Sequence, residues 1–304
     1  MRNFQRTINV EGKLSGLGLH TGKKATLKFI PAIINHGIKF QRIDLDNKPL
    51  INADVDNVIA VERGTTLSQN DAKVSTVEHL MGALYGLGID NLVVELNSQE
   101  VPILDGSAKV FIEKILSVGI KSSSTPIKLI KIEKKVSYEE GSKTISLDKS
   151  KVASEIDFEI KFKNKVIGTQ RNKINIFNDD LKEIYESRTF CLYEDVEKLK
   201  SAGLAKGGSL ENAIVVEEQK ILNTEGMRNS KEFVNHKILD CMGDLYLSGY
   251  RIVGSLITSQ GGHALTNKLI RKIFADKSNF AVIEIKEKTL PHQILDRSYL
   301  KSIA

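Results

Sequence analysis

The stretch that most constrains this chain runs from Lys231 to Gly249, KEFVNHKILDCMGDLYLSG. At about 100° per residue it predicts one helix with a continuous apolar stripe. That stripe comprises Val234, Ile238, Cys241, Met242 and Leu245. On the other side, His236, Asp240 and Asp244 stand at i, i+4 and i+8, so an imidazole and a carboxylate stack on adjacent turns. Such a pair suits a metal ion, but the same spacing also describes an ion pair on a solvated helix face.

A second helix is predicted from Val74 to Gly88, VSTVEHLMGALYGLG, and it also carries a histidine beside a carboxylate. Its core stripe comprises Val77, Leu80, Met81, Leu84 and Leu87. Glu78 and His79 fall off this stripe, on a face of glycine and alanine that lets another element approach closely. Ser75 and Glu78 also stand at capping-box spacing. A glutamate held on Ser75 would not be free for proton transfer, so both interpretations of Glu78 stay open.

Length and composition limit the function classes. The chain has 304 residues, of which 41% are hydrophobic and 27% charged, which predicts a globular protein of about two domains. No apolar run approaches the roughly 20 residues that a membrane span requires, and the first residues lack an apolar signal core. Cys191 and Cys241 are the only cysteines, which excludes a disulfide framework and a cysteine-rich zinc site. We therefore expect a cytoplasmic protein.

The charge of the chain bears on its partners. The net charge is +6, with basic residues dispersed among acidic ones rather than gathered into a block with aromatics. We therefore expect no nucleic-acid partner and no stable membrane insertion. A mild positive charge is compatible with an anionic small substrate and with peripheral contact with an anionic membrane surface.

The two halves of the chain repeat one order of elements: strands, a helix with a histidine off its core stripe, a buried strand, a loop and another helix. In the first half the strands are expected at 6–10, 24–30 and 91–96, and the second helix at 108–118. In the second half, strands are expected at 127–134, 143–147, 154–162, 213–216 and 252–258, and helices at 180–186 and 264–274. The polar stretch KSSSTP, 121–126, is the expected linker. This pattern predicts an α+β fold with domains at residues 1–122 and 127–304.

Four histidines are candidates for chemistry: His20 in a glycine-rich loop, His79, His236, and His263 after Gly261-Gly262. His36 and His292 are expected at the surface. Two imidazoles, one carboxylate and an open position are how proteins hold catalytic zinc, which brings the pKa of water towards about 7. A base and an acid are then needed, and Glu78 and His263 are candidates. Spacing alone favours a metal hydrolase. The alternatives are a zinc amidase or peptidase of different substrate range, a sugar-nucleotide binding protein and a purely structural protein.

Seven stretches together resemble one family: GLGLHTGK, STVEHLMGALYGLGIDN, PILDGSA, SRTF, GGS, HKILDCMGDL and GGHALTNKL. They are similar to the UDP-3-O-acyl-N-acetylglucosamine deacetylases, bacterial zinc enzymes of the first committed step of lipid A biosynthesis. The similarity runs in register from about Thr7 to Phe274. It implies two domains of similar topology, each a β-sheet layered against two helices, with the active site between them. It also implies an acylated UDP-sugar as the substrate, and we expect the enzyme to be a monomer.

The resemblance assigns a role to each matching residue. One Zn²⁺, with Fe²⁺ as the alternative in the cell, would be held by His79, His236 and Asp240. The reaction would use Glu78 as general base, protonated His263 as general acid, Asp244 to tune His263, Thr189 to donate to the oxyanion, and Lys237 to hold the substrate. The substrate would also contact Phe190, His20, Lys143, Phe162 and Asp195.

The same resemblance implies a hydrophobic passage for the acyl chain, walled by the glycine turn 203–208 within an insert at about 191–216. Two positions depart from the family pattern. Cys191-Leu192 follows Thr189-Phe190 where members often carry Gly-Phe, and Gln260 stands where some members carry lysine. These departures concern substrate contacts and leave the expected metal ligands untouched.

Overall fold

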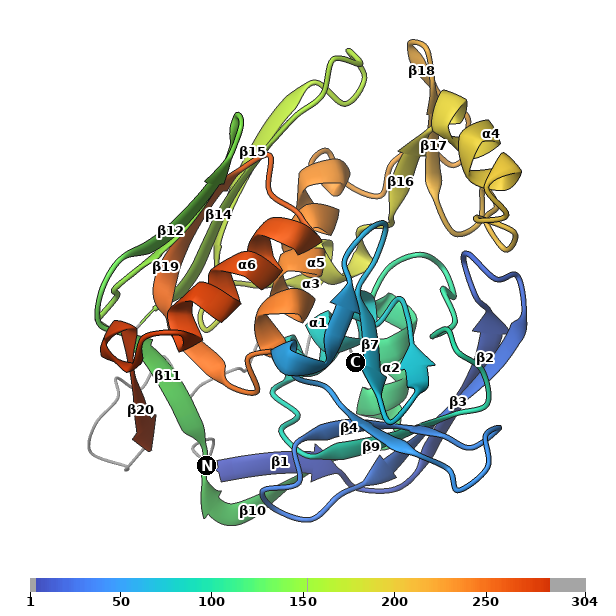
Figure 1. Cartoon of the computed structure of the whole chain (residues 1–304). Coiled ribbons are helices and arrows are strands. Elements are labelled where there is room, and N and C mark those ends of the chain that lie inside the picture. The colour runs from blue at the N-terminus through green and yellow to red at the C-terminus, as the bar shows by residue number, and fades with distance from the viewer. Residues whose placement is uncertain (1–3, 152, 285–304) are drawn as a thin grey trace.

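The structure is a computed structural model that describes residues 4–151 and 153–284. The expected surface residue His292, and residues 285–304 of the expected second domain, lie outside the described residues. The fold is α+β, as predicted, with mixed sheets packed against helices (Figure 1). Among the described helices, none combines the length and the apolar character needed to cross a membrane.

The first half of the chain builds a five-stranded sheet in the order β2-β3-β9-β4-β5. Its strands are β2 (Gly12–Leu17), β3 (Lys24–Pro31), β4 (Ile38–Arg42), β5 (Leu50–Asn52) and β9 (Leu92–Leu96). The central strand β9 runs antiparallel to β3 and parallel to β4. Alternate side chains such as Leu27, Phe29 and Val94 are fully buried, because one face of the sheet packs on helices.

The second half builds a seven-stranded sheet with β12-β13-β19-β11-β20 as its main path, and β14 joins β19 to β15. Its strands are β11 (Lys128–Ile132), β12 (Val136–Glu140), β13 (Lys143–Asp148), β14 (Ser154–Lys161), β15 (Thr169–Asn175), β19 (Arg251–Ser259) and β20 (Phe280–Glu284). The strand after the helix with the off-core histidine is therefore central in both sheets, β9 in one and β19 in the other. This correspondence agrees with the duplicated order read from the sequence.

The expected linker is itself a strand. Residues of β10 (Ile120–Pro126) pair antiparallel with β1 (Phe4–Ile8) at the start of the chain. The expected linker is therefore an ordered, paired segment, because serine and threonine in an extended segment can pair with a free strand edge. Two separated segments are thus joined where the chain passes from one half to the other.

Two small three-stranded sheets lie beside the large ones. In the first half they are β6 (Val58–Ala60), β7 (Thr66–Gln69) and β8 (Ala72–Val74), preceded by the 3₁₀ turn Val55–Asn57. In the second half they are β16 (Phe190–Leu192), β17 (Ile214–Glu217) and β18 (Lys220–Ile221), with helix α4 (Tyr193–Ser201) beside them. Another 3₁₀ turn, Lys277–Asn279, precedes β20.

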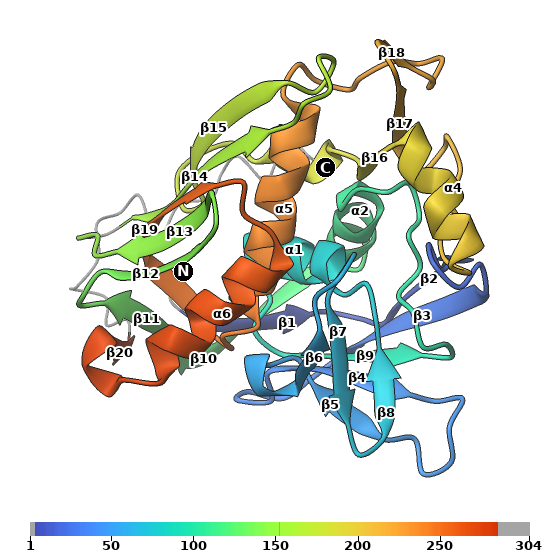
Figure 2. The same cartoon turned by 45° about the horizontal axis from the view of Figure 1, so that its top comes forward.

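The remaining helices are α1 (Glu78–Leu87), α2 (Lys109–Ser117), α3 (Lys182–Glu186), α5 (Glu232–Tyr246) and α6 (His263–Phe274). They form a layer between the two large sheets, with α1 and α5 in contact at its centre (Figures 1 and 2). Every residue of α1 is buried, and in α5 only Lys237 is not. The side of α5 that carries His236 and Asp240 is therefore no solvated helix face, because α1 covers it.

Two glycines let α1 and α5 approach this closely. A Cβ at Gly243 of α5 would lie 2.8 Å from the carbonyl carbon of Glu78 on α1, and one at Gly82 would lie 2.9 Å from the Leu239 carbonyl oxygen. Both distances are shorter than an ordinary Cβ contact. The small-residue face read from the first helix thus receives the second helix.

The first turn of α1 differs from the prediction. The helix begins at Glu78, its N-cap is Val77, and no side chain caps it. Ser75 instead donates from Oγ to the Gln99 carbonyl oxygen, and Thr76 adopts a left-handed conformation with φ of 57° that separates β8 from the helix. The capping-box interpretation of Glu78 was therefore wrong, and its carboxylate is not held on Ser75.

Candidate active site and metal centre

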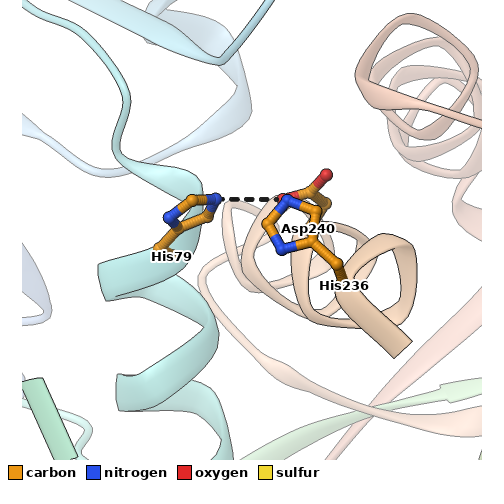
Figure 3. Close-up of side chains that lie close together, drawn as sticks. All are labelled: His79, His236 and Asp240. Carbon is orange, nitrogen blue, oxygen red and sulfur yellow. Dashed lines mark ion pairs between the residues drawn. The ribbon is translucent and has the colours of Figure 1, made fainter. Parts of the chain in front are cut away.

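Three side chains from the two halves meet where α1 and α5 cross. His79 Nε2 lies 3.4 Å from Asp240 Oδ1, and His236 Nε2 lies 3.4 Å from the same oxygen. One donor atom from each of the three residues lies within 4.8 Å of the others, and all three residues are buried. Figure 3 shows the imidazole of His79 pointing from α1 towards Asp240 and His236 on α5. The two distant halves therefore contribute to one cluster.

The donor spacing suits a small divalent ion. Nitrogen and oxygen ligands about 2.0–2.1 Å from a tetrahedral ion are about 3.4 Å from each other, which matches both pairs with Asp240. Asp240 Oδ1 is buried and accepts no hydrogen bond within the described parts of the chain. A buried carboxylate oxygen without a donor is costly, and a cation between it and the two imidazoles would satisfy it.

The two ring nitrogens of His236 have different partners. Its Nδ1 lies 3.2 Å from the carbonyl oxygen of Ser187, which can only accept, so Nδ1 carries the proton and Nε2 presents its lone pair to Asp240. Burial lowers the pKa of His236 to about 3 against the opposing charge of Asp240. The imidazole is therefore neutral, as a metal ligand must be.

Asp240 is ionised. Burial alone would raise its pKa, but His236, Lys237, His79 and His263 together lower it well below the usual range for a carboxyl group. Lys237 donates from Nζ to Asp240 Oδ2 at 2.9 Å. Its own pKa is raised, because the attraction of Asp240 outweighs the effect of burial. A lysine ammonium thus stands at the edge of the cluster with its charge kept.

Glu78 lies beside the cluster without belonging to it. Burial raises the pKa of its carboxyl group, although His263 and His79 act in the opposite direction. Its Oε2 accepts a hydrogen bond from the backbone N–H of Thr65 at 3.0 Å. A carboxylate with a raised pKa beside a reaction centre is suited to accept and return a proton.

His263 and Asp244 form a hydrogen-bonded pair beside the cluster. His263 Nδ1 lies 2.6 Å from Asp244 Oδ2, while His263 Nε2 lies 3.9 Å from Asp240 Oδ2. Burial alone would lower the pKa of His263, but Asp244, Asp240 and Glu78 raise it to about 10. The imidazolium is therefore charged throughout the neutral range and can act as a proton donor. Asp244, the residue expected to tune His263, is thus its hydrogen-bond partner.

The segment before β16 is fixed from both halves. The backbone N–H of Thr189 donates to the Gly106 carbonyl oxygen at 2.8 Å, and its carbonyl oxygen accepts from Ile214 N–H at 2.8 Å. Phe190, which follows, stacks edge to face with Phe162, at 5.6 Å between ring centroids, and with Phe233, at 4.9 Å. The turn Asp105–Ser107 therefore positions Thr189 through its backbone.

Most of these side chains line one cavity of about 770 Å³. Of the expected site residues, those that line it are His20, Glu78, His79, Lys143, Phe162, Thr189, Phe190, Asp195, His236, Lys237, Asp240 and His263. Asp244 lies behind His263 rather than on the wall. Lys143 is exposed at the start of β13, Asp195 pairs with Lys198 at 3.2 Å on α4, and Gln260 lies close to Ser142, so these three stand at the rim.

The glycine turn 203–208 closes one side of the cavity against the first half of the chain. Lys206 and Gly207 donate their backbone N–H groups to the carbonyl oxygens of His20 and Leu19, at 3.3 and 3.0 Å. A Cβ at Gly207 would lie 3.2 Å from the carbonyl carbon of Gly18. Only a bare backbone fits at this contact.

Three features of the site were not predicted from the sequence. Thr65 donates from its backbone to Glu78 and from its hydroxyl to Asp244 Oδ1 at 2.7 Å. The fully buried Arg188, beside Thr189, pairs through Nε with Glu232 at 2.8 Å. Glu100 accepts hydrogen bonds from the backbone of His20 and Thr21 and so holds the glycine-rich loop. No spacing in the sequence points to these contacts, because each joins residues at least 40 positions apart or uses a backbone group.

The sequence of this chain is similar to those of known proteins over nearly its whole length. A family model described as UDP-3-O-acyl N-acetylglycosamine deacetylase (LpxC) matches residues 5–275. A protein of Myxococcus xanthus (strain DK1622) named UDP-3-O-acyl-N-acetylglucosamine deacetylase is 44% identical over 290 residues, covering 94% of this chain and 91% of that protein. Proteins of the same name from Psychrobacter sp. (strain PRwf-1) and Stenotrophomonas maltophilia (strain K279a) are 41% and 40% identical. They cover 92% and 95% of this chain, and 95% and 96% of their own lengths.

Proposed function

The chain belongs to the UDP-3-O-acyl-N-acetylglucosamine deacetylase family, and we propose that it hydrolyses the N-acetyl group of UDP-3-O-(3-hydroxyacyl)-N-acetylglucosamine. The products are the free amine and acetate, and the reaction is the committed step of lipid A biosynthesis. The observation that carries this proposal is that His79, His236 and Asp240 meet from two halves of the chain, beside Glu78, which is not part of the cluster. The enzyme is a metal-dependent hydrolase acting on a linear amide.

We propose that these three residues hold one Zn²⁺. Two neutral imidazoles and a carboxylate are a suitable set for zinc, and Fe²⁺ is accepted by the same donor types. A divalent ion held there supplies Lewis acidity, which lowers the pKa of water and polarises a carbonyl group. The single unsatisfied oxygen of Asp240 supports this assignment.

In the proposed reaction Glu78 and His263 move the protons. Glu78 accepts a proton from the attacking water, which its raised pKa favours. His263, charged near neutral pH, gives its Nε2 proton to the departing amine as the carbon–nitrogen bond breaks. Asp244 stays on Nδ1 and keeps Nε2 directed towards the cavity.

Thr189 and Lys237 hold the reacting groups. The Thr189 hydroxyl donates to the oxygen that becomes negative when water adds to the acetamide carbon. The ammonium of Lys237 lies 5.8 Å from the centre of the Phe190 ring and binds the substrate beside it. Both residues line the cavity next to the cluster.

The rest of the cavity takes the remainder of the substrate. Phe190 and Phe162 pack on the sugar and the start of the acyl chain. His20, Lys143 and Asp195 contact the nucleotide sugar or line its passage. The acyl chain lies along the wall formed by the insert at about 191–216. The apolar lining from α4 and β17, including Val196, Leu199 and Val215, supports this assignment.

The proposal includes the organisation of the enzyme. Residues 1–122 and 127–304 are taken as two domains, since each large sheet has its own helices. A single chain is taken as the active unit, since the ligands come from both halves of one chain. A cytoplasmic location is consistent with two free cysteines, Cys191 and Cys241. The proposed contact with the membrane surface is peripheral.

The test pairs metal content with acetate release from the acylated nucleotide sugar. His236→Ala should lose stoichiometric zinc. Glu78→Ala should keep zinc and lose about 10²- to 10⁴-fold in kcat, the range for a general base. The matched control is His36→Ala, because the His36 ring hydrogen-bonds to the Gly37 carbonyl oxygen and does not line the cavity. This variant should keep both zinc and activity. Equal zinc loss in the first two variants would make Glu78 a ligand or a fold element, and a wild-type chain that releases no acetate would refute the proposed function.

A further inference from the structure

Thr65 lies close to both residues that the proposed reaction uses for proton transfer, Glu78 and His263. It is a buried residue between β6 and β7, directly after Gly64, and it stands behind Glu78 and His263 rather than on the cavity wall. Its backbone N–H donates to Glu78 Oε2 at 3.0 Å. Its hydroxyl donates to Asp244 Oδ1 at 2.7 Å. One residue of the first half thus binds a carboxylate from each half.

Through Asp244 these hydrogen bonds continue to His263, which lines the cavity. Asp244 receives Thr65 on Oδ1 and His263 on Oδ2, at 2.7 and 2.6 Å. Thr65 Oγ1 itself lies 3.5 Å from His263 Nδ1. With both oxygens engaged, the Asp244 carboxylate is fixed in rotation, and so is the imidazole ring that it holds. His263 Nε2 is thereby kept on the cavity side, 3.9 Å from Asp240 Oδ2.

The surroundings of Thr65 leave little room for another arrangement. A Cβ at Gly64 would lie 2.9 Å from Glu78 Oε1, so the loop packs against the carboxylate with its bare backbone. The Val77 N–H donates to the Thr65 carbonyl oxygen at 3.4 Å, which ties the loop to the start of α1. The loop therefore has a fixed relation to Glu78 that does not depend on the Thr65 hydroxyl.

We propose that Thr65 is a positioning residue that sets the orientation of the Asp244–His263 pair relative to Glu78, so that base and acid face the same substrate amide from opposite sides. This inference rests on the proposed function, because it assigns Thr65 a part in the same reaction. The hydroxyl acts only through Asp244, whereas the backbone N–H acts on Glu78. A side-chain substitution therefore separates the two contacts.

The test compares Thr65→Val with Thr65→Ser in the zinc-loaded enzyme. Valine keeps the shape and the backbone N–H but removes the donor to Asp244, and serine keeps the donor. Because Thr65→Val removes a hydrogen bond to a charged group, we expect kcat to fall by about 10- to 100-fold. KM and zinc stoichiometry should stay at wild-type values, and Thr65→Ser should recover most of the rate. Thr66→Val, at the partly exposed neighbouring position, is the matched control.

A double-mutant cycle with Asp244→Ala completes the test. If Thr65 acts through Asp244, adding Thr65→Val to Asp244→Ala should cost no further activity. An additive loss, a wild-type kcat in Thr65→Val, or a parallel loss of zinc would each overturn the inference. Each of these results requires an active wild-type enzyme, so they are distinct from failure of the proposed function, in which the wild type itself releases no acetate.

Discussion

Gly243→Ala is the perturbation that most directly tests how the two halves share the metal centre. Alanine favours a helix over glycine by about 1 kcal/mol, so an isolated α5 would gain stability from it. In the folded chain, however, the new Cβ would lie 2.8 Å from the Glu78 carbonyl carbon and closer still to its oxygen. Since ordinary Cβ contacts begin at 3.4 Å, α1 and α5 must separate by at least about 0.6 Å.

That separation acts on the ligand set. His79 travels with α1, whereas His236 and Asp240 travel with α5, so the 3.4 Å spacing between His79 Nε2 and Asp240 Oδ1 must grow. Metal–ligand distances tolerate only about 0.2 Å. We expect zinc affinity to fall at least as far as it does when supporting residues around a metal are changed, about 10- to 100-fold.

The assay is competition for zinc against a chelator of known affinity, together with thermal unfolding of the zinc-free protein. The matched control is Gly86→Ala, also on α1, where the new Cβ would meet the Tyr185 ring on α3, two turns from His79. Gly86→Ala should lower stability and leave zinc affinity unchanged. If Gly243→Ala binds zinc as tightly as the wild type, the argument that helix contact sets the ligand spacing is wrong.

Two further predictions concern buried charges. Glu232→Gln should destabilise the chain by about 3 kcal/mol, the low end for a broken buried pair, because Arg188 keeps Glu225 and the Gly226 carbonyl oxygen as acceptors. Denaturant unfolding measures this loss, and a change below about 1 kcal/mol, no larger than for a surface pair, would contradict the buried role. In the zinc-free protein, folding raises the pKa of His263 from 6.5 to about 10, so the protonated imidazole stabilises the folded state. This stabilisation should be fully present below pH 6.5. That stabilisation, at most about 5 kcal/mol, should disappear as pH rises to 10, and the difference in unfolding free energy between wild type and His263→Gln should follow the same curve.

Much of the helical framework was predictable because burial of one helix face leaves a 3.6-residue period. Both helices that carry metal-ligand candidates, and the central strands β9 and β19, were predicted near their observed positions. The region from β4 to β7 was not predicted, because its strands are short and separated by polar turns. That the expected linker, 121–126, is a paired strand could not be predicted either, because pairing with β1 is a contact between distant segments that composition does not reveal.

The site was predictable in part. Spacing identified each histidine beside its carboxylate, and the family resemblance joined them into one set. What spacing could not give is the crossing of α1 and α5, which depends on two glycines meeting a facing backbone. The capping-box interpretation failed because Thr76 takes a left-handed conformation that β-branched residues rarely adopt. The Thr65 contacts could not be predicted from spacing either, because they form only in the tertiary fold.

The contact between the glycine turn 203–208 and the loop before Lys23 has a consequence for which acyl chains the enzyme accepts. Two backbone hydrogen bonds and an approach with no room for a side chain join these segments. A longer chain cannot be admitted by swinging this wall outward without breaking both bonds and parting the two halves. If the acyl chain lies along this wall, as proposed, selectivity for its length depends on the bulk of individual side chains there, and single substitutions would alter it with no change in the loops.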